Sequence, residues 1–120
     1  MEQMRVLIVD DHKEIRDVVR DYLPNGVDEV FECKDGTDAL ESYRQHLPDW
    51  VLMDWEMPEK NGVTAVREII GEFPEANICM VTAFDDEEIR KDAFLAGVVG
   101  FVLKENLFEL EDLLSKSSRL

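Results

Sequence analysis

The 120-residue sequence has few cysteines, few basic residues and no long apolar run. The chain has two cysteines, Cys33 and Cys79, and such sparse use of cysteine fits a cytosolic protein. No apolar run approaches the roughly 18–20 residues that span a bilayer. The N-terminal residues lead straight into a strand-like segment and lack the charged and apolar regions of a signal peptide. We therefore expect a cytoplasmic protein that crosses no membrane.

Positive charge is also scarce. The chain has 13 Lys and Arg residues against 28 Asp and Glu, so its formal net charge is −15 at pH 7. A field of this sign repels the phosphates of nucleic acids and anionic lipids, which argues against direct binding to either. Apolar residues make up 45% of the chain, an ordinary share for a globular protein, and this excludes bulk disorder.

No internal repeat, linker or low-complexity tract divides the chain. At roughly 100–200 residues per domain, residues 1–120 fit one domain and leave no room for a second, such as an output domain. A chain of this size buries about two-thirds of its unfolded surface, which is enough for one hydrophobic core without disulfides or metals.

Short apolar runs alternate with longer amphipathic stretches. Five runs read as buried parallel strands, at 6–9, 30–33, 50–53, 78–81 and 101–103. Five stretches carry apolar residues at helical spacing, at 15–23, 39–47, 63–73, 89–96 and 107–114. Five such units in sequence imply a parallel sheet with helices on both faces. The sequence thus predicts a doubly wound (βα)5 fold of the α/β class.

Polar residues stand at the carboxyl ends of four predicted strands, where open α/β sheets bind ligands. They are Asp10 and Asp11, Asp54, Thr82 and Lys104. Each has a purely structural alternative. Asp11 with Glu14 fits a capping box at the start of a helix, and Asp54 fits a turn. Thr82 fits a helix cap, and Lys104 fits a solvated lysine at the end of a strand.

Taken together, these residues favour a chemical site. Two unit charges about 4 Å apart repel by roughly 4 kcal/mol at an effective dielectric constant near 20. A fold avoids such a carboxylate cluster unless a cation belongs there, and hard oxygen ligands suit Mg²⁺. A metal, a carboxylate nucleophile, a hydroxyl and a lysine are the parts that phosphoryl transfer to an aspartate needs.

Four motifs in order carry a resemblance to a known family. They are Val-Leu-Ile-Val-Asp-Asp-His at 6–12, Pro-Asp-Trp-Val-Leu-Met-Asp-Trp-Glu-Met-Pro at 48–58, Met-Val-Thr-Ala at 80–83 and Gly-Phe-Val-Leu-Lys at 100–104. With these motifs the sequence resembles the receiver domain of two-component response regulators over essentially its whole length. The resemblance implies a flavodoxin-like five-stranded sheet of order 2-1-3-4-5.

The resemblance also implies residue roles. Asp54 matches the aspartate that is phosphorylated. Asp10 and Asp11 match the acidic pair that holds Mg²⁺, completed by the Asp54 carboxylate and the backbone carbonyl of Glu56.

Four further positions match residues that surround the phosphoryl group or respond to it. Thr82 matches the hydroxyl that turns toward the phosphoryl group, and Ala83 the small residue that leaves it access. Lys104 matches the lysine that pairs with the phosphoryl oxygens. Phe101 matches the switch aromatic that moves inward with Thr82.

The implied function is a signalling switch, not an enzyme for an external substrate. A sensor histidine kinase, a phosphotransfer protein or a small acyl phosphate supplies the phosphoryl group. The face made by the fourth helix, fifth strand and fifth helix then changes to control an output domain or partner, with homodimerisation through that face as one possibility.

Two alternatives belong to other classes. A phosphatase with an aspartyl-phosphate intermediate carries Asp-x-Asp, which Asp54-Trp55-Glu56 breaks. A flavin or nucleotide carrier needs a first loop rich in Gly, Ser and Thr, whereas this loop is Asp-Asp-His. The Asp-Asp-His start resembles receivers that precede a helix-turn-helix domain, and the sequence leaves open whether the chain is stand-alone or excised.

Some positions depart from the family pattern. Glu105 follows Lys104 where proline is frequent, and because a non-proline cis bond costs about 3–4 kcal/mol we expect a trans peptide there. Trp55 is bulkier than the usual aliphatic residue beside the nucleophile. Glu56 and Phe84, two residues past Asp54 and Thr82, resemble family positions that tune the lifetime of the phosphoryl group through water access.

The remaining polar and apolar residues have simpler interpretations. His12 and His46 share no metal-ligand spacing, so we expect both to be solvated. With the order 2-1-3-4-5, Cys33 and Cys79 lie about 14 Å apart, too far for a disulfide. Phe108 falls off the inward stripe of its helix and is expected to be exposed, either as a lone apolar residue or as part of a partner surface.

Overall fold

Five strands and five α-helices alternate along residues 4–116, the part of the chain that the computed structural model describes. The strands are β1 (Met4–Val9), β2 (Val27–Cys33), β3 (Trp50–Met53), β4 (Ile78–Thr82) and β5 (Gly100–Leu103). The helices are α1 (Lys13–Asp21), α2 (Ala39–His46), α3 (Gly62–Glu72), α4 (Glu87–Ala96) and α5 (Glu109–Lys116). Short 3-10 helices at Gly36–Asp38 and Lys104–Asn106 precede α2 and α5.

The strands form one parallel sheet in the order β2-β1-β3-β4-β5, which confirms the predicted (βα)5 flavodoxin-like fold. Strand β1 lies between β2 and β3, and residues Val6–Val9 pair with Trp50–Met53. The chain therefore winds to one side of β1 and then to the other. Ligands of such sheets bind at this reversal, beyond the carboxyl ends of the strands.

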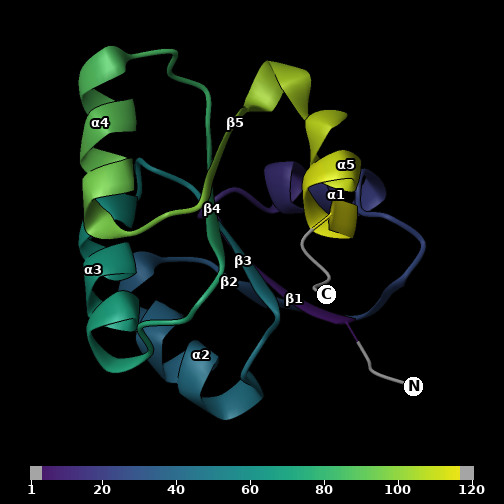
Figure 1. The fold of residues 1–120 in the computed structure, drawn as a ribbon, viewed down its shortest axis with the longest axis horizontal. Helices are drawn as coiled ribbons and strands as arrows, with labels where there is room; N and C mark the ends of the chain where they lie inside the picture. Colours follow the sequence, from purple (N-terminus) through teal and green to yellow (C-terminus); the bar gives the residue numbers. More distant parts are fainter. Residues whose placement is uncertain (1–3, 117–120) are drawn as a thin grey trace.

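Helices cover both faces of the sheet. Helices α2, α3 and α4 lie on one face, and α1 and α5 lie on the other (Figure 1). Strand side chains alternate between the two cores, as the period of a β-strand requires: Leu7 and Val9 pack with the first group, Val6 and Ile8 with the second. Burial on both faces explains why the central strands are apolar at every position.

The predicted apolar stripe of α1 is too wide. Ile15, Val19 and Leu23 pack against the core, but Val18 and Tyr22 are 42% and 45% exposed. At 100° per residue, Val18 and Tyr22 lie on one edge of the stripe, and the helix is rotated so that this edge faces outward. Within residues 4–116 no helix is both long and apolar enough to cross a bilayer.

The structural alternatives for two polar residues prove wrong. Helix α1 begins after His12, so Asp11 is not its N-cap and forms no capping box. Helix α4 is capped by Asp86, whose carboxylate accepts hydrogen bonds from two backbone N–H groups of the first turn. Thr82 lies four residues before that cap, at the last position of β4. Neither Asp11 nor Thr82 is therefore needed to begin a helix.

Candidate functional site

The ends of three strands bring together two carboxylates and one ammonium group. Asp10 follows β1, Asp54 follows β3 and Lys104 follows β5. The Lys104 Nζ lies 2.9 Å from Asp10 Oδ2 and 2.9 Å from Asp54 Oδ1. The side chains of the two aspartates are only 5% and 6% exposed and that of Lys104 is 17% exposed. The alternatives of a simple turn aspartate and a solvated lysine are therefore wrong.

A close backbone contact fixes the loop that carries Asp54. The Asp54 N–H donates to the Val9 carbonyl at 2.9 Å, and the Gly62 N–H donates to the Trp55 carbonyl at 2.7 Å. A Cβ atom on Gly62 would stand 2.1 Å from the Asp54 carbonyl oxygen, so only glycine fits there. The start of α3 thus packs directly against the backbone of the candidate nucleophile, a constraint that no local sequence pattern indicates.

The electrostatics of the cluster reflect burial first and an excess of negative charge second. Burial raises the pKa of Asp54 to about 6; its hydrogen bond with Lys104 opposes the rise, and the charges of Asp10 and Asp11 add to it. For Lys104, burial acts to lower the pKa, but the hydrogen bonds to Asp54 and Asp10 outweigh it and raise the pKa above the ordinary lysine value. Three carboxylates against one ammonium group leave a formal charge of −2.

Asp11 and His12 extend the cluster outward. Asp11 Oδ1 is buried and accepts no hydrogen bond from any residue of the described range, although His12 Nδ1 lies 3.2 Å from it. The same imidazole nitrogen lies 3.3 Å from Asp10 Oδ1, which also accepts a hydrogen bond from the His12 backbone N–H at 2.9 Å. The His12 side chain is 62% exposed, as expected, but it is not isolated, because it contacts both aspartates, which its spacing in the sequence does not indicate.

The donor set fits a hard divalent cation. Asp11 Oδ1 is a buried carboxylate oxygen without a hydrogen bond, which is costly unless a cation or proton meets it. Asp11, His12, Glu56, Met57 and Pro58 line a hollow of about 440 Å³, so the backbone segment around Glu56 faces the same space as Asp11. Carboxylate and carbonyl oxygens beside an open volume are what Mg²⁺ binds in proteins, with water completing its shell.

The candidate switch residues belong to the next two strands of the sheet: Thr82 is the last residue of β4, and Phe101 lies in β5. Thr82 is fully buried, and its Oγ1 accepts a hydrogen bond from the Phe84 N–H at 3.1 Å. Phe101 is half-buried, and the guanidinium carbon of Arg90 lies 5.1 Å from its ring centroid. Trp55 and Phe84 meet edge to face with ring centroids 6.0 Å apart, so the segments that follow β3 and β4 are in contact through two aromatic rings.

Four smaller predictions can be checked directly. No peptide bond within residues 4–116 is cis, so the Lys104–Glu105 bond is trans, as expected. Cys33 and Cys79 are both free thiols, and Phe108 is 64% exposed. His46 differs from expectation: it is half-buried because its ring stacks on Phe31 with centroids 3.8 Å apart.

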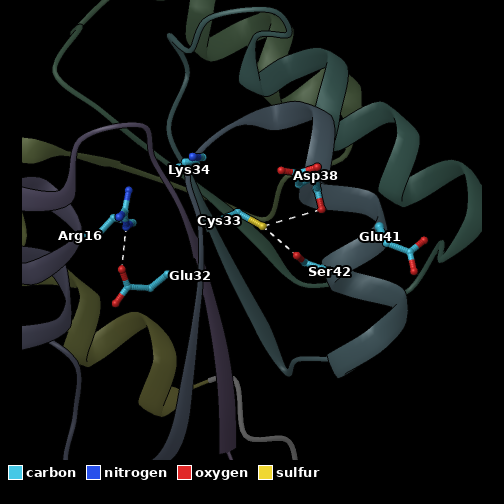
Figure 2. A pocket seen from close by; sticks show the side chains of 7 residues that line it. All are labelled: Arg16, Glu32, Cys33, Lys34, Asp38, Glu41 and Ser42. Carbon is cyan, nitrogen blue, oxygen red and sulfur yellow. Dashed lines mark hydrogen bonds and ion pairs between the residues drawn. The ribbon is translucent and has the colours of Figure 1, made fainter.

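A second hollow, of about 450 Å³, lies beside the end of β2 and the start of α2 (Figure 2). The Cys33 thiol points to Ser42 and donates to its hydroxyl at 2.9 Å, and burial raises the pKa of that thiol. Glu32 pairs with the guanidinium groups of Arg16 and Arg20. A protonated thiol is a poor nucleophile, and so is a carboxylate whose charge is balanced by two arginines. This hollow therefore offers no chemistry comparable to that of the Asp54 cluster.

Comparison with known proteins agrees with this geometry. Residues 6–117 match the family described as the response regulator receiver domain. The chain is 41% identical over 101 residues to the chemotaxis protein CheY of Bacillus subtilis, covering 83% of this chain and 84% of CheY. It is 37% identical over 117 residues to protein CcdB of the same organism, covering 97% and 96% of the two chains.

A solved structure shows the same likeness. A LuxR-family two-component response regulator from Aurantimonas superimposes with a TM-score of 0.89 at 30% identity, over 97% of this chain and 85% of that one. The chain also matches several transcriptional regulators, of which it spans about half the length.

These matches show that the chain belongs to the receiver domain family of two-component response regulators. Receiver domains are phosphorylation-dependent signalling switches that interact with kinases or phosphotransfer partners. They bind Mg²⁺ at an acidic pocket, and an acidic cluster is present here. The family decides against the phosphatase and the flavin carrier.

Proposed function

We propose that Asp54 accepts the phosphoryl group, with Lys104 and the acidic cluster as its machinery. The observation that carries the proposal is the double contact of Lys104 Nζ with Asp10 and Asp54, both buried at the carboxyl edge of the sheet. The donor is a sensor histidine kinase, a phosphotransfer protein or a small acyl phosphate. Residues 1–120 act as one phosphoacceptor domain.

In the transfer step an Asp54 carboxylate oxygen attacks phosphorus in line with the leaving group. A new oxygen–phosphorus bond forms, the bond from phosphorus to the donor's nitrogen or oxygen breaks, and the electron pair leaves with the donor. Lys104 holds Asp54 Oδ1, so we assign the attack to Oδ2. A pKa of about 6 leaves Asp54 mostly ionised at neutral pH and so able to attack.

The proposed site for Mg²⁺ consists of the acidic side chains of the cluster and one neighbouring backbone carbonyl. The carboxylates of Asp10, Asp11 and Asp54 and the backbone carbonyl of Glu56 would hold it. When bound, the ion offsets charge on the equatorial phosphoryl oxygens, where phosphoryl transfer needs electrostatic help. The ammonium group of Lys104, which follows β5, supplies a second positive charge that offsets charge on the same phosphoryl oxygens.

The signal then passes through Thr82 and Phe101. To meet a phosphoryl oxygen, the Thr82 hydroxyl gives up the hydrogen bond that it now accepts from the Phe84 N–H. Phe101 follows inward and leaves the guanidinium group of Arg90. Both movements change the face formed by α4, β5 and α5.

That face is suited to a protein partner. Exposed apolar side chains stand on α4 and just before α5: Phe94 is 42% and Leu95 75% exposed on α4, and Phe108, which precedes α5, is 64% exposed. These residues support docking of an output domain, another partner or a second copy of the chain. A net charge of −15 disfavours direct contact with nucleic acid.

A phosphoryl-uptake assay tests the proposal. With a small acyl phosphate and Mg²⁺, the intact mass of the protein should rise by one phosphoryl group, and EDTA should abolish the rise. Asp54→Asn should take up none, whereas the matched control Asp85→Asn, an exposed aspartate past β4, should label like wild type. Undiminished uptake by Asp54→Asn would overturn the proposal.

A further inference from the structure

His12 differs from the other groups around the cation site because it offers a nitrogen. One oxygen of Asp10, one of Asp11 and one ring nitrogen of His12 lie within 4.8 Å of one another, the one such group of His, Cys, Asp and Glu within residues 4–116. We propose that His12 is a ligand in the divalent-cation site, which makes the site prefer first-row transition metals such as Mn²⁺ and Ni²⁺ over Mg²⁺. This inference rests on the proposed function, since it assumes that the acidic cluster binds a divalent cation.

The spacing of the donor atoms supports shared coordination. His12 Nδ1 lies 3.3 Å from Asp10 Oδ1 and 3.2 Å from Asp11 Oδ1. Ligand atoms bound to one ion at about 2.1 Å and at right angles stand about 3 Å apart, so the imidazole nitrogen already sits at a ligand-to-ligand distance from both carboxylates. Little movement of the side chains is needed to enclose an ion.

The backbone holds His12 in this place. Its N–H donates to Asp10 Oδ1, and its carbonyl accepts the first hydrogen bonds of α1, from the N–H groups of Ile15 and Arg16. The imidazole is therefore attached to a fixed point of the chain rather than to a loose surface loop. Asp11 Oδ1, which is buried and accepts no hydrogen bond within the described residues, lies 3.2 Å from the same imidazole nitrogen.

Ligand chemistry gives the direction of the preference. Mg²⁺ takes oxygen ligands, whereas imidazole suits later divalent metals, whose affinity for a given site rises from Mn²⁺ toward Ni²⁺ and Cu²⁺. A receiver cation site with only oxygen donors selects its ion by the charge and size of that ion. Adding one nitrogen donor should raise the affinity for Ni²⁺ far more than that for Mg²⁺.

The tautomer of His12 also follows from this assignment. In the metal-free protein a hydrogen on Nδ1 can donate to the Asp10 carboxylate. Coordination needs the Nδ1 lone pair, so in the metal-bound protein the ring hydrogen stands on Nε2.

A substitution that exchanges nitrogen for oxygen gives the sharpest test. His12→Asn keeps a short polar side chain but offers an amide oxygen in place of the imidazole nitrogen. Isothermal titration of the whole chain at one fixed pH should show Ni²⁺ binding weakened about ten-fold or more, with Mg²⁺ binding about unchanged. His46→Asn is the matched control, because His46 stacks on Phe31 at the end of α2 and should leave both affinities as in wild type.

A spectroscopic measurement gives an independent readout. The electron spin echo of bound Mn²⁺ should carry a nitrogen coupling in wild type and in His46→Asn, and that coupling should be absent in His12→Asn. Equal weakening of Ni²⁺ and Mg²⁺ binding in His12→Asn, no weakening of either, or no nitrogen coupling in wild type would overturn the inference.

The same titrations separate this inference from the proposed function. If wild type binds Mg²⁺ and loses it in Asp11→Asn, the cation site stands whatever His12 does. If wild type binds neither Mg²⁺ nor Ni²⁺, both the cation site and the role of His12 fail together.

Discussion

Two hollows of nearly equal volume, about 450 and 440 Å³, lie next to the carboxyl ends of neighbouring strands. Beside β2, the Glu32 carboxylate meets two arginines, and the Cys33 thiol is buried with a raised pKa. Beside β1 and β3, three carboxylates, those of Asp10, Asp11 and Asp54, face the single ammonium group of Lys104 among the described residues. Volume does not separate the two places, but unbalanced buried charge does.

The two carboxylates respond to their surroundings in opposite directions. Hydrogen bonds from Arg20 and Arg16 lower the pKa of Glu32, whereas burial raises that of Asp54 to about 6. A structural ion pair favours the charged form of its members. At a cation-binding site, the protein alone disfavours the charged form of a carboxylate, and a bound cation would supply the missing positive charge.

The largest effect is expected from the glycine behind Asp54. Gly62→Ala places a methyl group 2.1 Å from the Asp54 carbonyl oxygen and should destabilise the fold by about 3 kcal/mol or more. Gly71→Ala, in the exposed part of the same helix with nothing within 4 Å, should stabilise by about 0.5–1 kcal/mol. Urea melts measure both changes, and a mild effect of Gly62→Ala would contradict the close packing of the site loop.

A medium effect is expected where a buried ion pair is broken. Without Mg²⁺, Lys104→Met leaves the carboxylates of Asp10 and Asp54 without the ammonium group that pairs with them. The substitution should lower the free energy of unfolding by about 2 kcal/mol. Saturating Mg²⁺ should recover more stability in this variant than in wild type, because the ion replaces the missing charge.

The control for Lys104 is a lysine in an ordinary pair. Lys60 Nζ lies 2.7 Å from Glu68, with side chains 25% and 37% exposed, so Lys60→Met should cost less than about 1 kcal/mol and should not alter the response to Mg²⁺. Equal losses in the two variants, by the same urea melts, would remove the distinction between a site and a surface pair.

The pH dependence of stability should differ in sign between the two carboxylates. The raised pKa of Asp54 contributes stability that is fully present below pH 3.8 and is lost as the pH rises through about 6. Above pH 6 and without Mg²⁺, Asp54→Asn should therefore exceed wild type by on the order of 2 kcal/mol, and the difference should vanish near pH 3.8.

Glu32→Gln gives the opposite curve. The lowered pKa of Glu32 contributes stability that is present above pH 4.5 and is lost as the pH falls through its folded-state value. Because this pair is partly exposed, the variant should lose less than about 1 kcal/mol at neutral pH. Melts in acetate and phosphate buffers check both curves, and parallel slopes for the two variants would refute the comparison.

Much of the fold and the core of the site could be predicted from local patterns. Runs such as Val6–Val9 are apolar at each position because both faces of the strand are covered, and Asp10 and Asp54 were located by their place after such runs. The order of the strands came from the resemblance, since periodicity does not say which strands are neighbours. The edge strand β2 begins at Val27, earlier than predicted, because Asp28 and Glu29 are exposed and interrupt the apolar run.

What could not be predicted depends on contacts between distant segments. Nothing local says that Lys104 pairs with Asp10 rather than Asp11, because that choice follows from where β5 lies relative to β1. The need for Gly62 arises from the return of the chain onto Asp54. The contact of His12 with two aspartates depends on the turn into α1, which ordinary metal-ligand spacings do not describe.

The central claim is that Asp54 is the phosphoacceptor of this chain, and mapping the modified residue tests it most directly. After reaction with a small acyl phosphate and Mg²⁺, borohydride reduces an aspartyl phosphate to homoserine, which peptide mass spectrometry locates. The account predicts homoserine at position 54 alone, and none when Mg²⁺ is withheld. Homoserine at position 10 or 11, or at several exposed acids in equal amounts, would contradict it.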